Sequence, residues 1–277
     1  MIPPTGRTRL AAVIGDPIRH SRSPQILNAA FEAAELDWVY VACEVADGQA
    51  GSAIDAMRTL GLGGLSVTMP HKTAVADHLA AQPWGALSPQ AERLRAVNCV
   101  AVDGDRLVGH NTDGAGFVAS LRADAGFEVA GRRAVVLGAG GAARALVLGL
   151  ADAGAAEVLV VNRSPDKAAD AAGLAPGVAR VGDADEVAGA DLVVNATSVG
   201  MDGRATPLDA ERLAAGQLVA DIVMSPLDTP LLQAARARGA ATLDGLGMLV
   251  RQAAVAFELW TGHPAPVEVM VRAAQQH

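Results

Sequence analysis

The feature that most constrains the fold is a glycine-rich segment between an apolar run and a helical pattern, "VVLGAGGAARALVLGL" at residues 135–150. Gly138, Gly140 and Ala143 occupy the three positions of a G-x-G-x-x-A pattern. The run before it is typical of a buried strand, and "EVLVV" at 157–161 supplies another strand after the helix. A strand, glycine loop, helix and strand in this order predict a parallel sheet covered by helices.

The same segment predicts a dinucleotide site. Glycines let the backbone approach a pyrophosphate, and the free amides at the helix start stabilise its charge. A glycine pattern alone often marks only a turn, but here the required strand and helix flank it. We therefore expect Gly138, Gly140, Gly141 and Ala142 to contact the cofactor.

The end of the second strand indicates which dinucleotide binds. An NAD site would present Asp or Glu there to bond the ribose 2′-hydroxyl. This chain has "VNRSPDK" instead, in which Asn162 and Ser164 flank Arg163, and Lys167 follows. Arg163 offers two parallel N–H donors for a 2′-phosphate, and Lys167 adds a second positive charge. Both could be ordinary surface charges, but the pattern favours NADP.

The whole chain predicts an α/β protein with two domains. Hydrophobic residues make up 51% of the 277 residues, enough for a sizeable core, and strand and helix patterns alternate twice. We expect an N-terminal α/β substrate domain with a mainly parallel sheet, formed by residues 1–110. Residues 111–242 should form a Rossmann-like NADP domain, and helices within 243–277 should return to the first domain.

Composition limits the partners. The net charge is −8, and no basic run indicates nucleic-acid binding. Cys43 and Cys99 lie in separate strand-like runs, so we expect two buried, reduced thiols, and no Cys/His cluster predicts a metal. A membrane-spanning helix needs about 18 consecutive apolar residues, and no apolar stretch of the sequence is that long. The first residues, "MIPPTGRTRL", are unlike a signal peptide. We expect a cytoplasmic enzyme for a small molecule, a monomer or a homodimer.

Two further segments carry candidate functional groups. In "GDPIRHSRSP", Ser21 and Ser23 precede Pro24, and hydroxyls beside a helix start can hold a carboxylate or simply cap the helix. In "SVTMPHK", Lys72 follows a short strand at a corner where Pro70 indicates the first turn of a helix. The residues alone leave Lys72 open, as a catalytic group or as one more solvated lysine.

The order of the motifs along the chain is more specific than any one of them. Together they resemble the shikimate dehydrogenase family over nearly the whole chain. The resemblance implies NADP-dependent interconversion of 3-dehydroshikimate and shikimate, on the route through chorismate to the aromatic amino acids. The motifs are "GDPIRHSRSP", "SVTMPHK", "AVNCV", "HNTDGAGF", "GAGGAARA", "NRS", "NATSVGM" and "GMLVRQAAVAFELWTG".

The resemblance also implies residue roles. Lys72 is the catalytic lysine and Asp113 its partner. A lysine can give a proton to the developing alkoxide and take it back, and its charge favours the oxyanion. The other implied contacts are Ser21 and Ser23 for the substrate carboxylate, Thr68, Asn98 and Gln252 for ring hydroxyls, and Asn195, Thr197, Met224 and Gly245 beside the cofactor.

Four positions depart from the usual family pattern: Leu27, Ser66, His71 and Met224. Met224 stands where tyrosine is usual, and a tyrosine hydroxyl there is expected near the substrate carboxylate. Two alternatives therefore stay open. One is a dehydrogenase of quinate or a related ring polyol acid. The other is a catalytically silent, NADP-binding regulatory paralogue, against which the retention of Lys72 and Asp113 argues.

Overall fold

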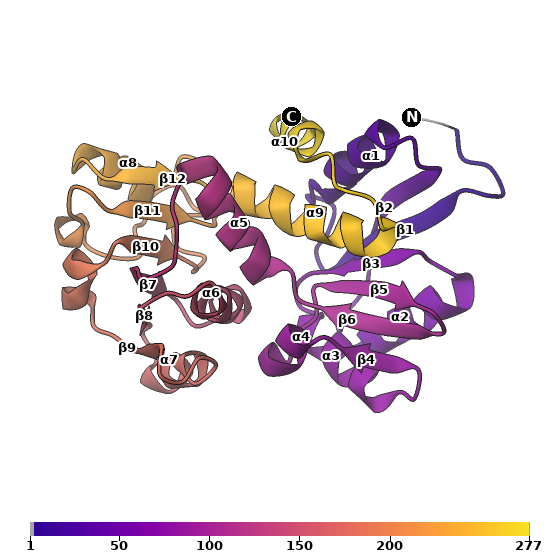
Figure 1. Ribbon diagram of the computed structural model, residues 1–277, viewed down its shortest axis with the longest axis horizontal. Helices are drawn as coiled ribbons and strands as arrows, with labels where there is room; N and C mark the ends of the chain where they lie inside the picture. The colour runs from indigo at the N-terminus through magenta and orange to yellow at the C-terminus, as the bar shows by residue number, and fades with distance from the viewer. Residues whose placement is uncertain (1–2, 277) are drawn as a thin grey trace. The chain divides into compact units, whose positions relative to one another are not determined.

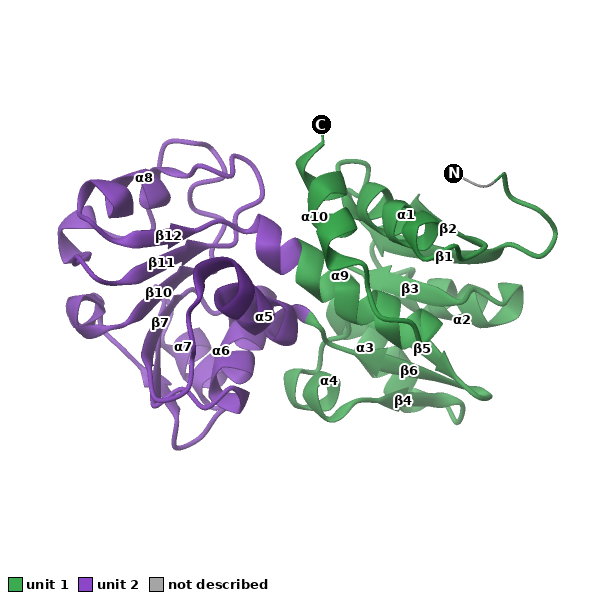
Figure 2. Cartoon of the chain, turned by 45° about the horizontal axis from the view of Figure 1, so that its top comes forward, with its two compact units in different colours: residues 1–112, 250–277 green, residues 113–249 purple. Residues whose placement is uncertain are grey.

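The computed structural model describes residues 3–276 and divides the chain into two compact units. Unit 1 contains the chain up to Thr112 and from Val250 onward, and unit 2 contains Asp113–Leu249 (Figure 2). We expected the domain boundaries after residues 110 and 242, and the units change after residues 112 and 249. One helix, α9 (Leu246–Thr261), continues unbroken from unit 2 into unit 1, so the sequence carries no turn signal at that boundary (Figure 1).

Unit 1 is built on a six-stranded sheet in the order β2-β1-β3-β5-β6-β4. β1 is parallel to β2 and β3, and β4 is parallel to β6, whereas β5 is antiparallel to both of its neighbours. β5 and β6 are antiparallel because Gly104, with φ of +57°, closes a tight hairpin between them. The strands are β1 Arg9–Gly15, β2 Trp38–Glu44, β3 Gly64–Val67, β4 Gly85–Leu87, β5 Cys99–Asp103 and β6 Arg106–His110.

The helices of unit 1 follow their sequence signals closely. Pro24 lies in the first turn of its helix, and Gly61, in the left-handed conformation, ends another. Pro70 is a correction: the helix begins at Lys72, and Pro70 lies in a turn closed by the bond from His71 N to Thr68 O, 3.0 Å. The helices are α1 Ser23–Ala33, α2 Ala50–Leu60, α3 Lys72–Ala81, α4 Pro89–Leu94 and α10 Val267–Gln275, with the second part of α9.

The C-terminal helices pack on unit 1, as we expected (Figure 2). Phe257 of α9 stacks on Phe31 of α1, with ring centroids 5.4 Å apart. Trp260 stacks on Tyr40 of β2 and donates from Nε1 to the Val100 carbonyl at 3.0 Å. The end of the chain thus completes the core of the N-terminal domain.

Unit 2 contains an all-parallel sheet in the order β12-β11-β10-β7-β8-β9, as expected for a Rossmann-like domain. Its inner strands are continuous runs of Val, Leu and Ala because helices cover both faces. The strand order reverses beside β7, and ligands bind at that point of an open α/β sheet. The strands are β7 Arg133–Leu137, β8 Glu157–Val161, β9 Ala179–Val181, β10 Leu192–Asn195, β11 Leu218–Asp221 and β12 Ala241–Leu243.

The helices of unit 2 are α5 Asp113–Ala125, α6 Gly141–Asp152, α7 Pro165–Ala172 and α8 Pro230–Ala237, with the first residues of α9 and the 3₁₀ segments η1 Ala184–Gly189 and η2 Ala210–Arg212. α5 and α6 pack against each other. A Cβ added at Gly114 would lie 2.5 Å from the Ala145 carbonyl oxygen, and one at Gly149 would lie 2.7 Å from the Gly114 Cα. Only glycine fits at both positions.

The two cysteines differ in environment, which corrects one expectation. Cys99 in β5 is buried, and burial raises the pKa of its thiol to about 12. Cys43 is exposed instead of buried, because β2 is the edge strand of the sheet and its last four residues face solvent. Within residues 3–276, none of the helices has the length and hydrophobicity to cross a bilayer.

The contact between Trp260 and the sheet yields a stability prediction. A Cβ at Gly64 of β3 would lie 2.4 Å from the buried Trp260 ring. We expect Gly64→Ala to lower the free energy of unfolding by about 1–3 kcal/mol, measured by urea denaturation, because the core must shift. The control is Gly6→Ala, since a Cβ there meets open space. Equal stability of Gly64→Ala and wild type would contradict this packing.

Candidate functional site

The glycine loop of unit 2 has a backbone that other residues could not adopt easily. Gly138, directly after β7, has φ of +111°, and a Cβ there would lie 3.0 Å from the Ala196 carbonyl oxygen. Gly140 is the N-cap of α6 and offers no side chain to its first turn. A Cβ at Gly140 or Gly141 would meet open space, so the amides at this helix start are accessible to a ligand. The loop therefore fits a pyrophosphate.

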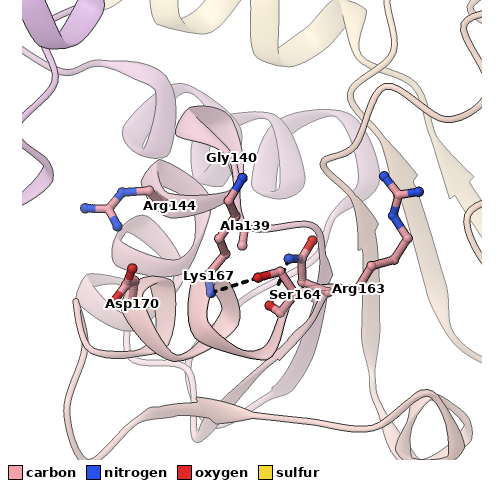
Figure 3. Close-up of a pocket in the computed structure, with 8 residues that line it drawn as sticks. Ala139, Gly140, Arg144, Arg163, Ser164, Lys167 and Asp170 are labelled. Carbon is pink, nitrogen blue, oxygen red and sulfur yellow. Dashed lines mark hydrogen bonds between the residues drawn. The ribbon is translucent and has the colours of Figure 1, made fainter.

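A pocket of about 420 Å³ opens beside this loop (Figure 3). The loop after β8 forms one wall of it. There Asn162 donates from Nδ2 to the Ser164 carbonyl oxygen at 3.1 Å, and Ser164 caps α7, its Oγ accepting from Lys167 N. The lining residues are Ala139, Gly140, Arg144, Asn162, Arg163, Ser164, Lys167 and Asp170.

This pocket gathers five of the residues that we expected at the cofactor: Gly140, Asn162, Arg163, Ser164 and Lys167. Three other residues of the lining, Ala139, Arg144 and Asp170, were not expected from the sequence. Arg144 had a usable signal, as the one charged residue in the segment 141–151. Asp170 had none, because it reaches the pocket only through the packing of α7 beside α6.

Asn195 holds the next loop together from inside. It is fully buried, and its Nδ2 donates to the Val199 carbonyl and to Asp221 Oδ1, both at 2.9 Å. Its Oδ1 accepts from the backbone N and the hydroxyl of Thr197, at 3.0 and 2.7 Å. With every donor and acceptor group engaged inside the protein, Asn195 shapes the loop, and the partly exposed Thr197 is the group that can face a ligand.

A buried carboxylate, Asp221 at the end of β11, connects this loop to the next one. Besides Asn195, it accepts from Val223 N at 3.0 Å and from the Thr229 hydroxyl at 2.7 Å. Burial raises the pKa of Asp221, and these hydrogen bonds act in the opposite direction. The carboxylate therefore ties together the loops that carry Thr197 and Met224.

Met224 and Gly245, from separate parts of the sequence, lie together in unit 2. A Cβ at Gly245 would approach the backbone of Ile222 to 3.0 Å and Met224 Sδ to 3.1 Å. Gly245 is therefore required for the chain that leaves β12 to pass the loop after β11.

In unit 1 the candidate residues lie at the ends of neighbouring strands. Thr68 follows β3, and its methyl group lies against Gly15 at the end of β1, where a Cβ would be 2.5 Å away. Lys72 is the first residue of α3, and its carbonyl accepts from Val97 N at 2.9 Å. Val67 N donates to the Asn98 carbonyl at 2.8 Å. These bonds bring Thr68, Lys72 and Asn98 to one edge of the sheet.

Hydrogen bonds link Asn98 through Thr112 to Gln252 of α9. Its Oδ1 accepts from Thr112 N at 2.8 Å, and its Nδ2 donates to the Thr112 hydroxyl at 3.0 Å. That hydroxyl lies 3.5 Å from Gln252 Oε1. Asp113, buried at the start of α5, follows Thr112 directly in the chain.

Ser21 and Ser23 lie at the start of α1. Arg22, not Ser23, is the N-cap residue, and Ser23 N donates to Ser21 Oγ at 3.3 Å. Because no side chain caps α1, the alternative of a simple capping role for Ser23 is wrong. Both serines are partly exposed.

His71 is buried next to Lys72. Its Nε2 lies 2.7 Å from the Val45 carbonyl and donates to it, because a carbonyl oxygen only accepts. The ring therefore anchors the start of α3 to the end of β2.

Matches to known families cover both units. Residues 13–100 match the family described as "Shikimate dehydrogenase substrate binding domain", and residues 245–275 match "Shikimate 5'-dehydrogenase C-terminal domain". Residues 133–225 match "NADP oxidoreductase coenzyme F420-dependent".

Individual relatives match the full length. A Moorella thermoacetica protein named shikimate dehydrogenase (NADP(+)) is 45% identical over 288 residues, covering 100% of this chain and 96% of the relative. The Thermus thermophilus shikimate 5-dehydrogenase, solved with NADP(H) and shikimate, superposes with a TM-score of 0.88 at 37% identity, covering 97% and 99% of the two chains. A Corynebacterium glutamicum quinate dehydrogenase, solved with NAD, gives 0.87 at 33% identity, covering 96% and 98%.

The buried Asp221 leads to a pH-dependent prediction. Thr229→Val removes a hydroxyl that favours the ionised carboxylate, so the folded-state pKa of Asp221 rises further. An acid with a folded pKa above its unfolded value of about 3.9 loses stabilisation as the pH rises through that interval. We therefore expect the variant to be less stable than wild type by about 1–3 kcal/mol at pH 7 and by less at pH 4.

Urea unfolding between pH 4 and pH 7 measures this difference. Thr229→Ser is the control, since it keeps the donor to Asp221 and the cap of α8. If the loss of unfolding free energy in Thr229→Val were the same at pH 4 and pH 7, the variant would act only through the lost cap of α8, and the prediction for Asp221 would be wrong.

Proposed function

The chain belongs to the shikimate dehydrogenase family, and from this we propose how its residues carry out the reaction. The protein is an NADP-dependent oxidoreductase that interconverts 3-dehydroshikimate and shikimate, a step of aromatic amino acid biosynthesis. Unit 1 would hold the substrate and unit 2 the cofactor. We expect the active form to be a monomer or a homodimer.

Lys72 carries the proton chemistry in this proposal. When bound, NADPH supplies the hydride that reduces the ketone carbon. The ketone oxygen then gains negative charge, which the Lys72 ammonium stabilises before it donates a proton to that oxygen. In the oxidative direction the amine accepts the proton from the substrate hydroxyl. Asp113 orients the ammonium through its carboxylate.

The observation that carries this assignment is the group of polar residues joined at one edge of the unit 1 sheet. The Lys72 carbonyl accepts from Val97 N, and Asn98, the next residue, bonds Thr112 through both its oxygen and its nitrogen. Asp113 directly follows Thr112. The backbone of Lys72 and the residue before Asp113 are therefore held by bonds to two successive residues, Val97 and Asn98, which supports this assignment.

The remaining polar residues of unit 1 suit a ring polyol acid. Thr68, Asn98 and Gln252 offer hydroxyl and amide groups to ring hydroxyls, and Ser21 and Ser23 offer two hydroxyls to the carboxylate. Each buried substrate hydroxyl requires a partner, so such a set discriminates against rings that lack one.

The cofactor assignment rests on the glycine loop and the pocket after β8. The loop suits the pyrophosphate, while Arg163 and Lys167 suit a 2′-phosphate. Thr197, Met224 and Gly245 would lie farther along the same cofactor, with Asn195 supporting Thr197 from below.

A related ring acid such as quinate is the second candidate, and Met224 is the observation that favours it. Where the family usually has tyrosine, a thioether is a poor hydrogen-bond acceptor and donates nothing. One lost neutral hydrogen bond costs on the order of 1 kcal/mol, or up to about 3 if its partner stays unsatisfied. This substitution bears on the choice of substrate and leaves the reaction type unchanged.

Variants of Lys72 and Lys167 test whether one residue serves the reaction and the other serves cofactor binding. We expect Lys72→Ala to lower kcat about 10²- to 10⁴-fold, as for the loss of a general acid, with an NADPH dissociation constant close to wild type. Lys167→Ala should do the reverse, weakening NADPH while keeping kcat at saturating cofactor. Steady-state kinetics and NADPH fluorescence titration measure both. Collapse of NADPH affinity in Lys72→Ala would overturn the assignment.

Absorbance of reduced nicotinamide, with shikimate or quinate and NADP or NAD in turn, tests the substrate. We expect the fastest turnover with shikimate and NADP. Met224→Tyr should lower the KM for shikimate about fivefold, as one restored hydrogen bond would, and Met224→Phe, which lacks the hydroxyl, should not. Preference for quinate would establish the second candidate. NADPH binding without any turnover would indicate the silent paralogue.

A further inference from the structure

Most cations of unit 2 already have a partner inside the protein. Arg133 and Arg180 share the carboxylates of Glu157 and Glu186. Arg238 donates to the Leu213 carbonyl at 2.8 Å. The other ion pairs are Arg122–Glu128, Arg132–Asp191, Arg212–Asp185 and Arg236–Asp228. Ion pairing inside the unit is the rule for its basic residues.

Four basic side chains of unit 2 depart from this rule. Within residues 3–276, the side chains of Arg144, Arg163, Lys167 and Arg204 form no ion pair or hydrogen bond. Three of the four, all but Arg204, line the pocket after β8. Several basic side chains without a carboxylate partner in one pocket indicate that the pocket binds an anionic ligand.

Arg144 is positioned for this from a different element than the other two. It lies in the first turn of α6, and its backbone N donates to the Gly140 carbonyl at 2.9 Å. The loop that suits a pyrophosphate and the Arg144 side chain are thus one helical turn apart. Figure 3 shows Arg144 and Asp170 extending on one side of the pocket and Arg163 on the other.

The charge of the pocket shows why Arg144 matters. Asp170 brings one negative charge to the lining, so Arg163 and Lys167 alone would leave one net positive charge. A phosphate monoester carries about −1.5 to −2 at pH 7. With Arg144 included, the lining has two net positive charges, which matches that dianion.

We propose that Arg144 is a third residue that binds the 2′-phosphate of NADP and so determines the preference for NADP over NAD. This inference rests on the proposed function, since it presumes that the pocket after β8 takes the phosphorylated ribose. It adds a specificity-determining residue from α6 to the motif after β8.

The test compares NADPH with NADH, which lacks the 2′-phosphate, on the full-length protein. Arg144→Ala keeps α6 intact, because alanine has the highest helix propensity. We expect it to weaken NADPH binding about tenfold to a hundredfold in fluorescence titrations, the loss of one charged hydrogen-bond partner, and to change NADH binding less than about twofold. Arg144→Lys should restore most of the NADPH affinity.

Two further variants make the result decisive. Arg204→Ala removes the other unneutralised arginine of unit 2, outside the pocket, and should leave both affinities unchanged. Arg163→Ala should weaken NADPH far more than NADH. If Arg163→Ala discriminates and Arg144→Ala does not, this inference is wrong and the cofactor assignment stands. Equal loss of NADPH and NADH in Arg144→Ala would also overturn it, by indicating a contact outside the phosphate. If neither variant discriminates, the pocket is not the 2′-phosphate site.

Discussion

The close packing of α5 against α6 at Gly114 and Gly149 couples two functional sites of unit 2, which lie at the starts of these two helices. α5 begins with Asp113, the proposed catalytic carboxylate, and α6 begins at the glycine loop that suits the pyrophosphate. A Cβ at either glycine would overlap backbone atoms of the other helix, so any larger residue would push the helices apart. Because protein interiors are close-packed, such a shift would be transmitted to both helix starts.

The loops with functional residues lie where parallel strands end. In unit 1, Ser21 follows β1 and Thr68 follows β3, and these two strands are parallel neighbours. In unit 2, Gly138 follows β7, Arg163 follows β8 and Asn195 ends β10, again in neighbouring parallel strands. The carboxyl ends of such strands meet at one edge, so residues far apart in the sequence can serve one ligand.

Several polar residues act by holding others in place. Asn195 uses its whole amide inside the protein, and Asp221 accepts hydrogen bonds from three different residues while buried. His71 does the same for the start of α3 through the Val45 carbonyl. A buried polar group is stable only when its partners are satisfied, so these residues determine the loop shapes that present Thr197, Met224 and Lys72.

Local patterns in the sequence were enough for the elements and for part of the site. The alternation of apolar runs with helical segments predicted the α/β class, and the apolar run at 157–161 predicted β8 at its observed limits, because these signals depend on neighbouring residues. The glycine loop and Arg163 were identified because a known chemical function requires them at a defined spacing. Lys72 and Asp113 were assigned by resemblance to a family, since nothing in their local sequence separates them from surface residues.

Only the tertiary structure decided which residues share a surface. Arg144 and Asp170 line the same pocket because α6 packs beside α7 and β8, and no local signal encodes that packing. Cys43 is exposed because its strand lies at the sheet edge, which depends on pairing across the whole unit. The hydrogen bonds of the buried Asn195 amide and the continuation of α9 from unit 2 into unit 1 also could not be predicted from local sequence. Each depends on contacts between segments distant in the chain, and local sequence patterns do not encode such contacts.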